Sequence, residues 1–146
     1  MSFTNDHQVI NSNRYNLTAV NGIGFNSTGQ KPLFCVPHIM PAGVKGVAID
    51  DIIIVSDTAT ASSSDTKKYA FQIKDKTNSN ELLETAIDTD SDGEIAADTS
   101  YRLTPEQNNT SLGGGTVLEL DITMTGSPTD LSSAEVTAYV HWHWEV

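Results

Sequence analysis

The chain has 146 residues, the usual size of one domain and enough to bury a single hydrophobic core. Nineteen acidic residues against eight basic ones give a formal net charge of -11, which repels phosphate backbones and disfavours nucleic-acid binding. No apolar stretch approaches the roughly 18 residues of a membrane span, and the N-terminal residues lack a signal-peptide pattern. We therefore expect a protein made in a cytoplasm, with no membrane or nucleic-acid partner.

Residues 1–30 are rich in Asn, Ser, Thr and Gly, a composition that predicts a polar N-terminal arm and loop. Within this segment a first strand is predicted at either 7–10 or 15–20, although neither alternates cleanly. The sandwich domain itself is predicted to cover residues 31–146. It would begin with an edge strand over 32–40, whose apolar residues suggest that the single cysteine, Cys35, is buried.

Residues 44–56 predict the first long strand. This run is rich in β-branched residues and apolar on both faces, except at Asp50 and Asp51. Such a pattern is typical of a strand that is largely buried, and the acidic pair predicts a bulge.

A second pair of strands is predicted after a Ser- and Thr-rich loop at 59–66. In the first of them, polar residues alternate with Tyr69, Phe71 and Ile73, which indicates a half-buried strand. The turn-forming residues 77–80 then predict that residues 82–87 return beside it.

The last third of the chain has the clearest alternation. Residues 117–124 alternate with a period of two, as in a strand with one wet face. After a turn at 126–129, the segment 134–146 alternates again. One side of it carries Val136, Ala138, Val140, Trp142 and Trp144, and the other carries Glu135, Thr137, Tyr139, His141, His143 and Glu145. We predict that the tryptophans face inward and that Tyr139, His141 and His143 form an outer interaction surface.

These elements together predict an all-β fold. The one helical signal is a single turn at 104–108, where Thr104 and Pro105 resemble a helix start. About seven or eight strands without helical crossovers favour an antiparallel two-sheet sandwich. We expect a jelly roll rather than an immunoglobulin topology.

The sharpest local motif is an acidic loop whose D-x-D-x-D-G pattern matches the first half of an EF-hand calcium loop. Carboxylates at alternate positions converge on a hard cation, and Gly93 permits the turn between them. The candidate calcium ligands are Asp88, Asp90, Asp92 and Glu94. The twelfth position is Thr99 instead of a bidentate Glu, and strands flank the loop. A solvated acidic loop is therefore the preferred interpretation, with calcium as the alternative and no other cofactor expected.

The terminal strand raises two further hypotheses. His141 and His143 project from the same face and supply two metal ligands, whereas zinc takes three or four from the protein. Trp142 and Trp144 are the right residues for stacking on sugar rings. Because they continue an apolar strand face, burial in the core or in an interface is preferred.

No catalytic residues are predicted. Ser, His and Asp all occur, but no G-x-S-x-G elbow places a nucleophile beside a base. The glycines at 113–115 lack the Lys and Ser or Thr of a phosphate-binding loop. We expect a protein that is not an enzyme.

The strands at 47–55 and 68–74, the loop between them, and the late strand pair at 117–124 and 135–142 give residues 46–146 a recognisable layout. In this layout the chain resembles the small β-sandwich structural proteins of tailed phages, which decorate heads or form parts of fibres and tails. The resemblance assigns no role to any single residue.

This resemblance implies a capsid decoration, or cement, protein. Such a protein lies on the outside of the virion, binds the major capsid protein and is commonly a homotrimer. Two alternatives stay open. One is a tail or fibre domain that grips surface sugars, and the other is a stand-alone carbohydrate-binding or calcium-stabilised adhesion module.

Overall fold

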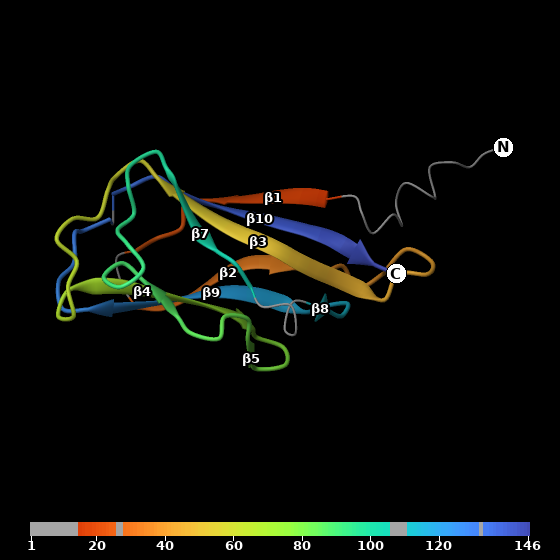
Figure 1. Cartoon of the computed structure of the whole chain (residues 1–146). Coiled ribbons are helices and arrows are strands. Elements are labelled where there is room, and N and C mark those ends of the chain that lie inside the picture. Colours follow the sequence, from red (N-terminus) through yellow and green to blue (C-terminus); the bar gives the residue numbers. More distant parts are fainter. Residues whose placement is uncertain (1–14, 26–27, 106–110, 132) are drawn as a thin grey trace.

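The computed structural model describes residues 15–25, 28–105, 111–131 and 133–146. Within these ranges the chain forms ten strands in two five-stranded antiparallel sheets, which pack face to face (Figure 1). The described residues form no helix, and hence none that could cross a membrane. The predicted all-β antiparallel sandwich is confirmed.

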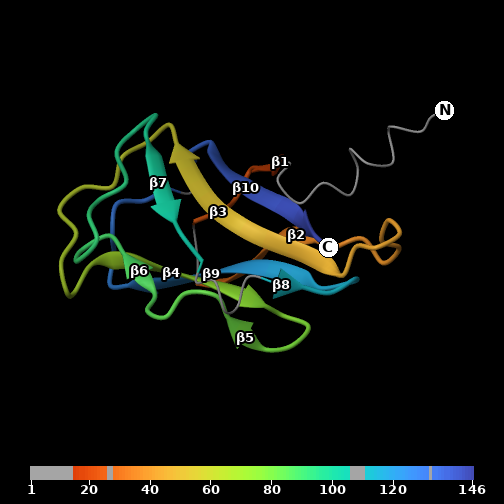
Figure 2. The ribbon, with the colours of Figure 1, turned by 45° about the vertical axis from the view of Figure 1, so that its right-hand side comes forward.

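The two sheets are named after their central strands. The β3 sheet contains β1 (Tyr15–Asn21), β10 (Val136–Glu145), β3 (Gly46–Ser56), β7 (Ser100–Leu103) and β8 (Ser111–Leu112). The β4 sheet contains β2 (Gly29–Cys35), β9 (Val117–Thr125), β4 (Lys68–Asp75), β5 (Asn80–Glu81) and β6 (Ile87–Asp88). Figure 2 shows the two layers from a second direction.

The strand order is that of a jelly roll. The short strands β7 and β8 pair with successive parts of one edge of β3, and β5 and β6 do the same along β4. In one sheet β10 lies between β1 and β3, and in the other β9 lies between β2 and β4. Strands from the two ends of the chain therefore interleave, as they do in a jelly roll. The preference for this topology is confirmed.

The core lies between the sheets and is filled by the inward side chains that the alternation predicts. Ile52 and Ile54 on β3 and Val140 on β10 are fully buried, as are the corresponding residues of β4 and β9. On β4, the ring of Phe71 lies 5.6 Å from that of Phe25 and 5.7 Å from that of Tyr101 between centroids. These edge-to-face contacts tie the first and middle thirds of the chain to the central strands.

Residues 15–25 belong to the sandwich, so the predicted boundary at residue 30 is wrong for this segment. Strand β1 pairs with β10 along its whole length, and Ile23 and Phe25 are buried in the core. A strand at the sheet edge needs few large apolar residues, which is why a polar composition concealed it. Of the two predicted first strands, 15–20 is present as β1, and 7–10 lies outside the described residues.

Two bulges modify the strand faces. The register between β3 and β10 shifts so that His141 pairs with Asp51 and Trp142 with Ile49, which leaves Asp50 as the extra residue. The predicted bulge is confirmed. A second shift lies between Pro32 and Phe34 on β2, and beyond it Cys35 is exposed. The prediction that Cys35 is buried is wrong, because this irregularity changes the direction of the side chains.

Of the predicted return strand over 82–87, only residue 87 is in a strand, as part of β6, and β5 lies just before the predicted range. Between them the side chain of Gln72 takes the place of a backbone partner. Its Oε1 accepts the Leu83 N–H at 3.1 Å, and its Nε2 donates to the Leu83 carbonyl at 3.0 Å. The predicted helical turn at 104–108 extends beyond the described residues.

Candidate interaction surface

The outer surface of the β3 sheet gathers the residues that the sequence singled out. Strand β10 directs Tyr139, His141 and His143 to this surface, where all three are half-buried. Tyr139 lies opposite Ala19 on β1 and Ile53 on β3, and His141 lies opposite Leu17 and Asp51. The outer face is defined here as Leu17, Ala19, Asp51, Ile53, Tyr139, His141 and His143.

A hydrogen-bonded pair and an ion pair lie on this face near the β3 bulge. Both carboxylate oxygens of Asp50 lie 2.9 Å from Nδ1 of His143. The next carboxylate, Asp51, lies 3.0 Å from Nε of Arg102 on β7. Because the bulge adds a residue, β3 presents two consecutive carboxylates to strands on opposite sides of it. The face thus combines apolar side chains with partnered polar groups, a mixture suited to protein contact.

Each histidine of the terminal strand lies beside or opposite a carboxylate of β3. Nδ1 of His143 faces the Asp50 carboxylate, and His141 lies across from Asp51. Among the residues that the structure describes, no group of three or more His, Cys, Asp or Glu is placed to hold a metal ion.

Trp142 and Trp144 point inward, as their phase predicts. Both are half-buried and pack against the core. Their rings meet edge to face at 4.9 Å, and Trp142 also lies 5.4 Å from the ring of Phe34 on β2. The indole N–H of Trp142 donates to the Thr18 hydroxyl at 3.1 Å. These contacts hold both half-buried rings against the margin of the core, with the two ring planes nearly perpendicular.

The acidic loop follows β6, and its carboxylates have different partners. Asp88 lies 2.8 Å from the Lys68 ammonium and accepts hydrogen bonds from Ser91. Asp92 accepts the backbone N–H of Asp88, which closes the turn. Glu94 points elsewhere and accepts the backbone N–H of Ser63 at 2.6 Å. The four candidate ligands therefore do not converge, and calcium binding stays a prediction.

The electrostatics of this loop centre on Asp88. Partial burial opposes its ionisation, but the Lys68 ammonium and the N–H and O–H groups of Ser91 outweigh that effect and hold its pKa at about 2. Asp90 shows the opposite direction: desolvation and a hydrogen bond with the Asp65 carboxyl raise its pKa. One carboxylate of the motif is thus firmly ionised, and another is held less readily in its charged form.

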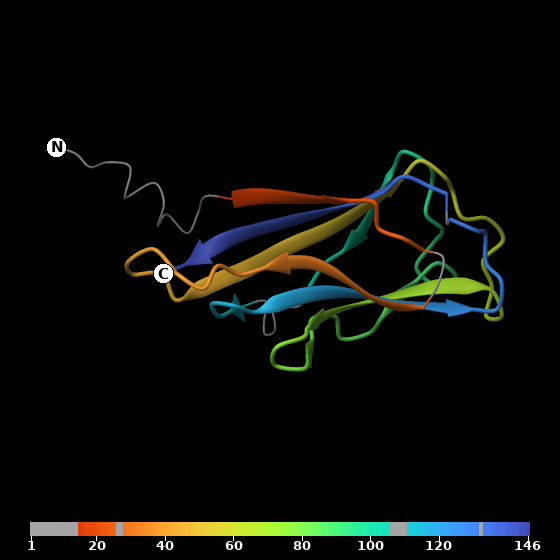
Figure 3. The same cartoon turned by 180° about the vertical axis from the view of Figure 1, so that it is seen from behind.

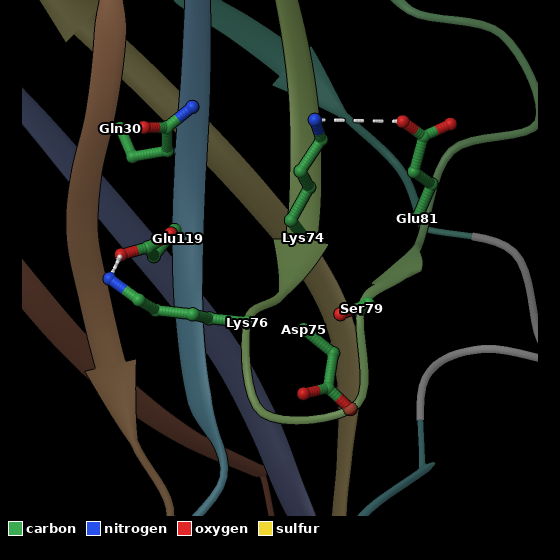
Figure 4. A pocket seen from close by; sticks show the side chains of 7 residues that line it. All are labelled: Gln30, Lys74, Asp75, Lys76, Ser79, Glu81 and Glu119. Carbon is green, nitrogen blue, oxygen red and sulfur yellow. Dashed lines mark hydrogen bonds and ion pairs between the residues drawn. The ribbon is translucent and has the colours of Figure 1, made fainter.

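The outer surface of the β4 sheet carries a charge ladder that the sequence analysis did not identify. Lys74 lies 2.6 Å from Asp121, which also accepts a hydrogen bond from Gln30 at 3.0 Å. Lys76 lies 2.8 Å from Glu119. A hollow of about 370 Å³ opens beside the ladder, lined by Gln30, Lys74, Asp75, Lys76, Ser79, Glu81 and Glu119 (Figure 4). The sequence feature from which this ladder could have been predicted is the alternation of opposite charges along β4 and β9. Because these charges compensate one another, we assign no ligand to the hollow.

Comparison with known proteins adds a fold relative. No family model matches the sequence, and no curated protein matches it. Among solved structures, a chain of the "Cyanophage Pam1 capsid asymmetric unit" is similar, with 14% sequence identity and a TM-score of 0.52. The match covers 90% of this chain and 84% of that one. At this level of identity the two chains share a fold over nearly their whole length.

Proposed function

We propose that this chain is a structural component of a virion, and specifically a capsid decoration protein that binds the major capsid protein on the outside of the shell. The observation that carries the proposal is the jelly roll shared with a chain of a cyanophage capsid over 90% of the residues. The tailed-phage resemblance of residues 46–146 supports the same class of protein independently.

The surface chemistry also supports this role. A net charge of -11 keeps a protein soluble at the high local concentration of a virion surface. The charged side chains on the outside of β4 and β9 neutralise one another in ion pairs, and a face of this kind is suited to solvent. The proposed role is architectural and not enzymatic, since it requires only a rigid domain and complementary contact surfaces.

The proposal includes a homo-oligomer, expected to be a trimer, in which the outer face mediates contact between copies. This face contains half-buried Tyr139 and Ile53 beside the exposed Leu17. A contact between copies would remove these apolar groups from water. It would also cover the edge of the β3 sheet at β1, which has neither proline nor charge.

The test uses the genomic neighbourhood and then binding. The proposal expects a major capsid gene close to the gene for this chain. Empty shells assembled from that capsid protein should cosediment with the full chain at a fixed ratio. Binding to purified tails but not to shells would reassign the chain to the tail, and binding to neither would overturn the virion proposal.

A further inference from the structure

Asn21 is the one asparagine of the sequence that a glycine follows. An Asn-Gly pair can react with itself, because glycine has no side chain to shield its backbone nitrogen from the preceding amide. Asn21 is the last residue of β1, and its side chain is exposed. After it the chain leaves the β3 sheet and crosses to the β4 sheet, where β2 begins (Figure 3). The pair therefore lies where a strand ends, within reach of water.

The backbone at Gly22 is open. A Cβ at this position would meet no atom within 4 Å, and the positive φ of 71° is one that glycine adopts without strain. The next N–H, that of Ile23, donates to the Val136 carbonyl at 3.1 Å. Within the part of the chain that the structure describes, the Gly22 N–H has no backbone partner of this kind. Its nitrogen is not held in the strand ladder and can turn toward the Asn21 amide.

Thr137 contacts this amide from the neighbouring strand. It is paired with Asn21 at the end of the ladder between β1 and β10. The Thr137 hydroxyl donates to Oδ1 of Asn21 at 3.1 Å. A hydrogen bond to this oxygen makes Cγ more electrophilic, and it stabilises the negative charge that develops on Oδ1 when a nucleophile attacks. The arrangement is that of one donor of an oxyanion hole.

We propose that Asn21 is a self-modification site, at which the Gly22 nitrogen attacks Cγ of Asn21 and the Thr137 hydroxyl stabilises the resulting oxyanion. The N–Cγ bond forms as the Gly22 N–H gives its proton to water. The Cγ–Nδ2 bond then breaks, and Nδ2 leaves as ammonia with a proton taken from water. A second water opens the five-membered succinimide at either carbonyl, which yields aspartate or isoaspartate. Water is the co-reactant throughout, and nothing is oxidised or reduced.

The modification changes the end of the edge strand in two ways. Either product replaces a neutral amide by a carboxylate, so the net charge becomes one unit more negative than -11. Isoaspartate also adds a methylene to the main chain just before Ile23 and Phe25, which are buried in the core. Because these two side chains anchor β1, the modification loosens the strand that contributes Leu17 and Ala19 to the outer face. The inference goes beyond the virion role and does not depend on it.

The test incubates the purified full chain in a mildly alkaline buffer and follows its peptides by mass spectrometry. The modified peptide gains the mass of water and loses that of ammonia. We expect this change at Asn21 and not at Asn16 or Asn78, because residues with side chains follow those two. Isoaspartate among the products identifies the succinimide route, since direct hydrolysis of the amide yields only aspartate.

Three full-length variants test the role of Thr137. Thr137→Val removes the hydroxyl and should slow the reaction by about twofold to tenfold, the effect of one hydrogen bond. Thr137→Ser keeps the hydroxyl and should react like the wild type. Thr123→Val makes the same change at an exposed position of the other sheet and should also react like the wild type. In concentrated urea the wild type and Thr137→Val should react at equal rates, since 116 positions separate Thr137 from Asn21 in the unfolded chain.

The possible outcomes are distinct. Modification at Asn21 that slows in folded Thr137→Val, but not in Thr137→Ser or Thr123→Val, supports the inference. An unmodified Asn21, or equal modification at Asn16 and Asn78, would overturn it. A folded Thr137→Val that reacts as fast as the wild type, or faster, would overturn it as well, because the hydrogen bond would then not assist the attack.

Discussion

The Asp50 carboxylate lies with both oxygens 2.9 Å from Nδ1 of His143, across the bulge where β3 meets β10. The two residues are 93 positions apart in the chain, and only the jelly-roll order makes them neighbours. Their side chains are 27% and 23% exposed, so the pair is partly screened by solvent. Removing either partner should therefore cost less than about 1 kcal/mol of folding stability. The outer face can be altered without unfolding the domain.

The first prediction concerns self-association through that face. We expect Tyr139→Ala and His141→Ala to lower the sedimentation coefficient from that of an oligomer to that of a monomer. The reason is that each substitution removes contact area at the centre of the outer face. Thr123→Ala is the control, because Thr123 is exposed on the other sheet. Unchanged sedimentation of both outer-face variants would exclude this face as the contact between copies.

The second prediction is a pH dependence from Asp88, whose pKa falls from 3.8 to about 2 in the folded protein. A pKa that is lower in the folded state stabilises the fold above the unfolded value, and this contribution is lost as pH falls from about 4 to about 2. We expect Lys68→Gln to lower the free energy of unfolding near neutral pH, by an amount that solvent screening of the solvent-accessible Lys68 ammonium keeps small. The difference from the wild type should shrink strongly by pH 2 and vanish only below it.

Urea denaturation measured between pH 2 and pH 7 checks this prediction. Lys67→Gln provides a matched control, since Lys67 is exposed and adjacent in sequence. A stability difference between Lys68→Gln and the wild type that does not change with pH would show that Lys68 acts through packing and not through the Asp88 charge.

The third prediction concerns calcium at the acidic loop. Asp88 is already neutralised by Lys68, and Glu94 is occupied by the Ser63 N–H. We therefore expect the same melting temperature in millimolar calcium and in chelator. A ligand that binds only the folded state raises the melting temperature, so a calcium-dependent rise of several degrees would establish the alternative interpretation.

The strands with strong alternation could be predicted from the sequence, and the edges could not. On β10 the period of two correctly separated the inward Trp142 from the outward His141, because both sides of that strand have a distinct environment. On β1 the inward side needs only Thr18 and Val20 at the margin of the core, so no apolar run marks the strand. At β2 the register shift near Leu33 leaves Cys35 exposed. No residue type in the sequence predicts such a shift.

The candidate surface, like the fold, was predictable only where the alternation of a strand is clear. The phase of β10 was sufficient to place Tyr139, His141 and His143 together on the outside. Their partners were not predictable, because Asp50 and Leu17 come from strands whose neighbours depend on the topology. Outside this surface, the exposure of Ile39 was also not predicted, because it lies within a short apolar segment that resembled a strand. Its exposure becomes visible only when Met40 is seen to face the core and Ile39 to face solvent.

The fourth prediction separates a packed tryptophan from a sugar platform. Trp142→Ala should destabilise the fold by about 3 kcal/mol, since the ring contacts Trp144 and Phe34 and its N–H bonds to Thr18. Trp142→Phe should recover most of this loss. Thermal melting checks both variants. A glycan array checks the alternative. The packed role would be contradicted if the wild type binds a sugar and Trp142→Ala loses that binding without a change in melting temperature.

The last prediction concerns Gln72, whose amide fills the gap between β5 and β6 at the edge of β4. Gln72 is 8% exposed, and its side chain satisfies both the N–H and the carbonyl of Leu83. Gln72→Leu keeps a similar volume but leaves these backbone groups without their partner, at a cost of about 1 to 3 kcal/mol. Gln30→Leu is the matched control, because its amide makes one exposed hydrogen bond to Asp121 and should cost less than about 1 kcal/mol. Hydrogen exchange should show the loss first at Leu83. Equal stability of the two variants would mean that water hydrogen-bonds to the Leu83 backbone as well as the Gln72 amide does.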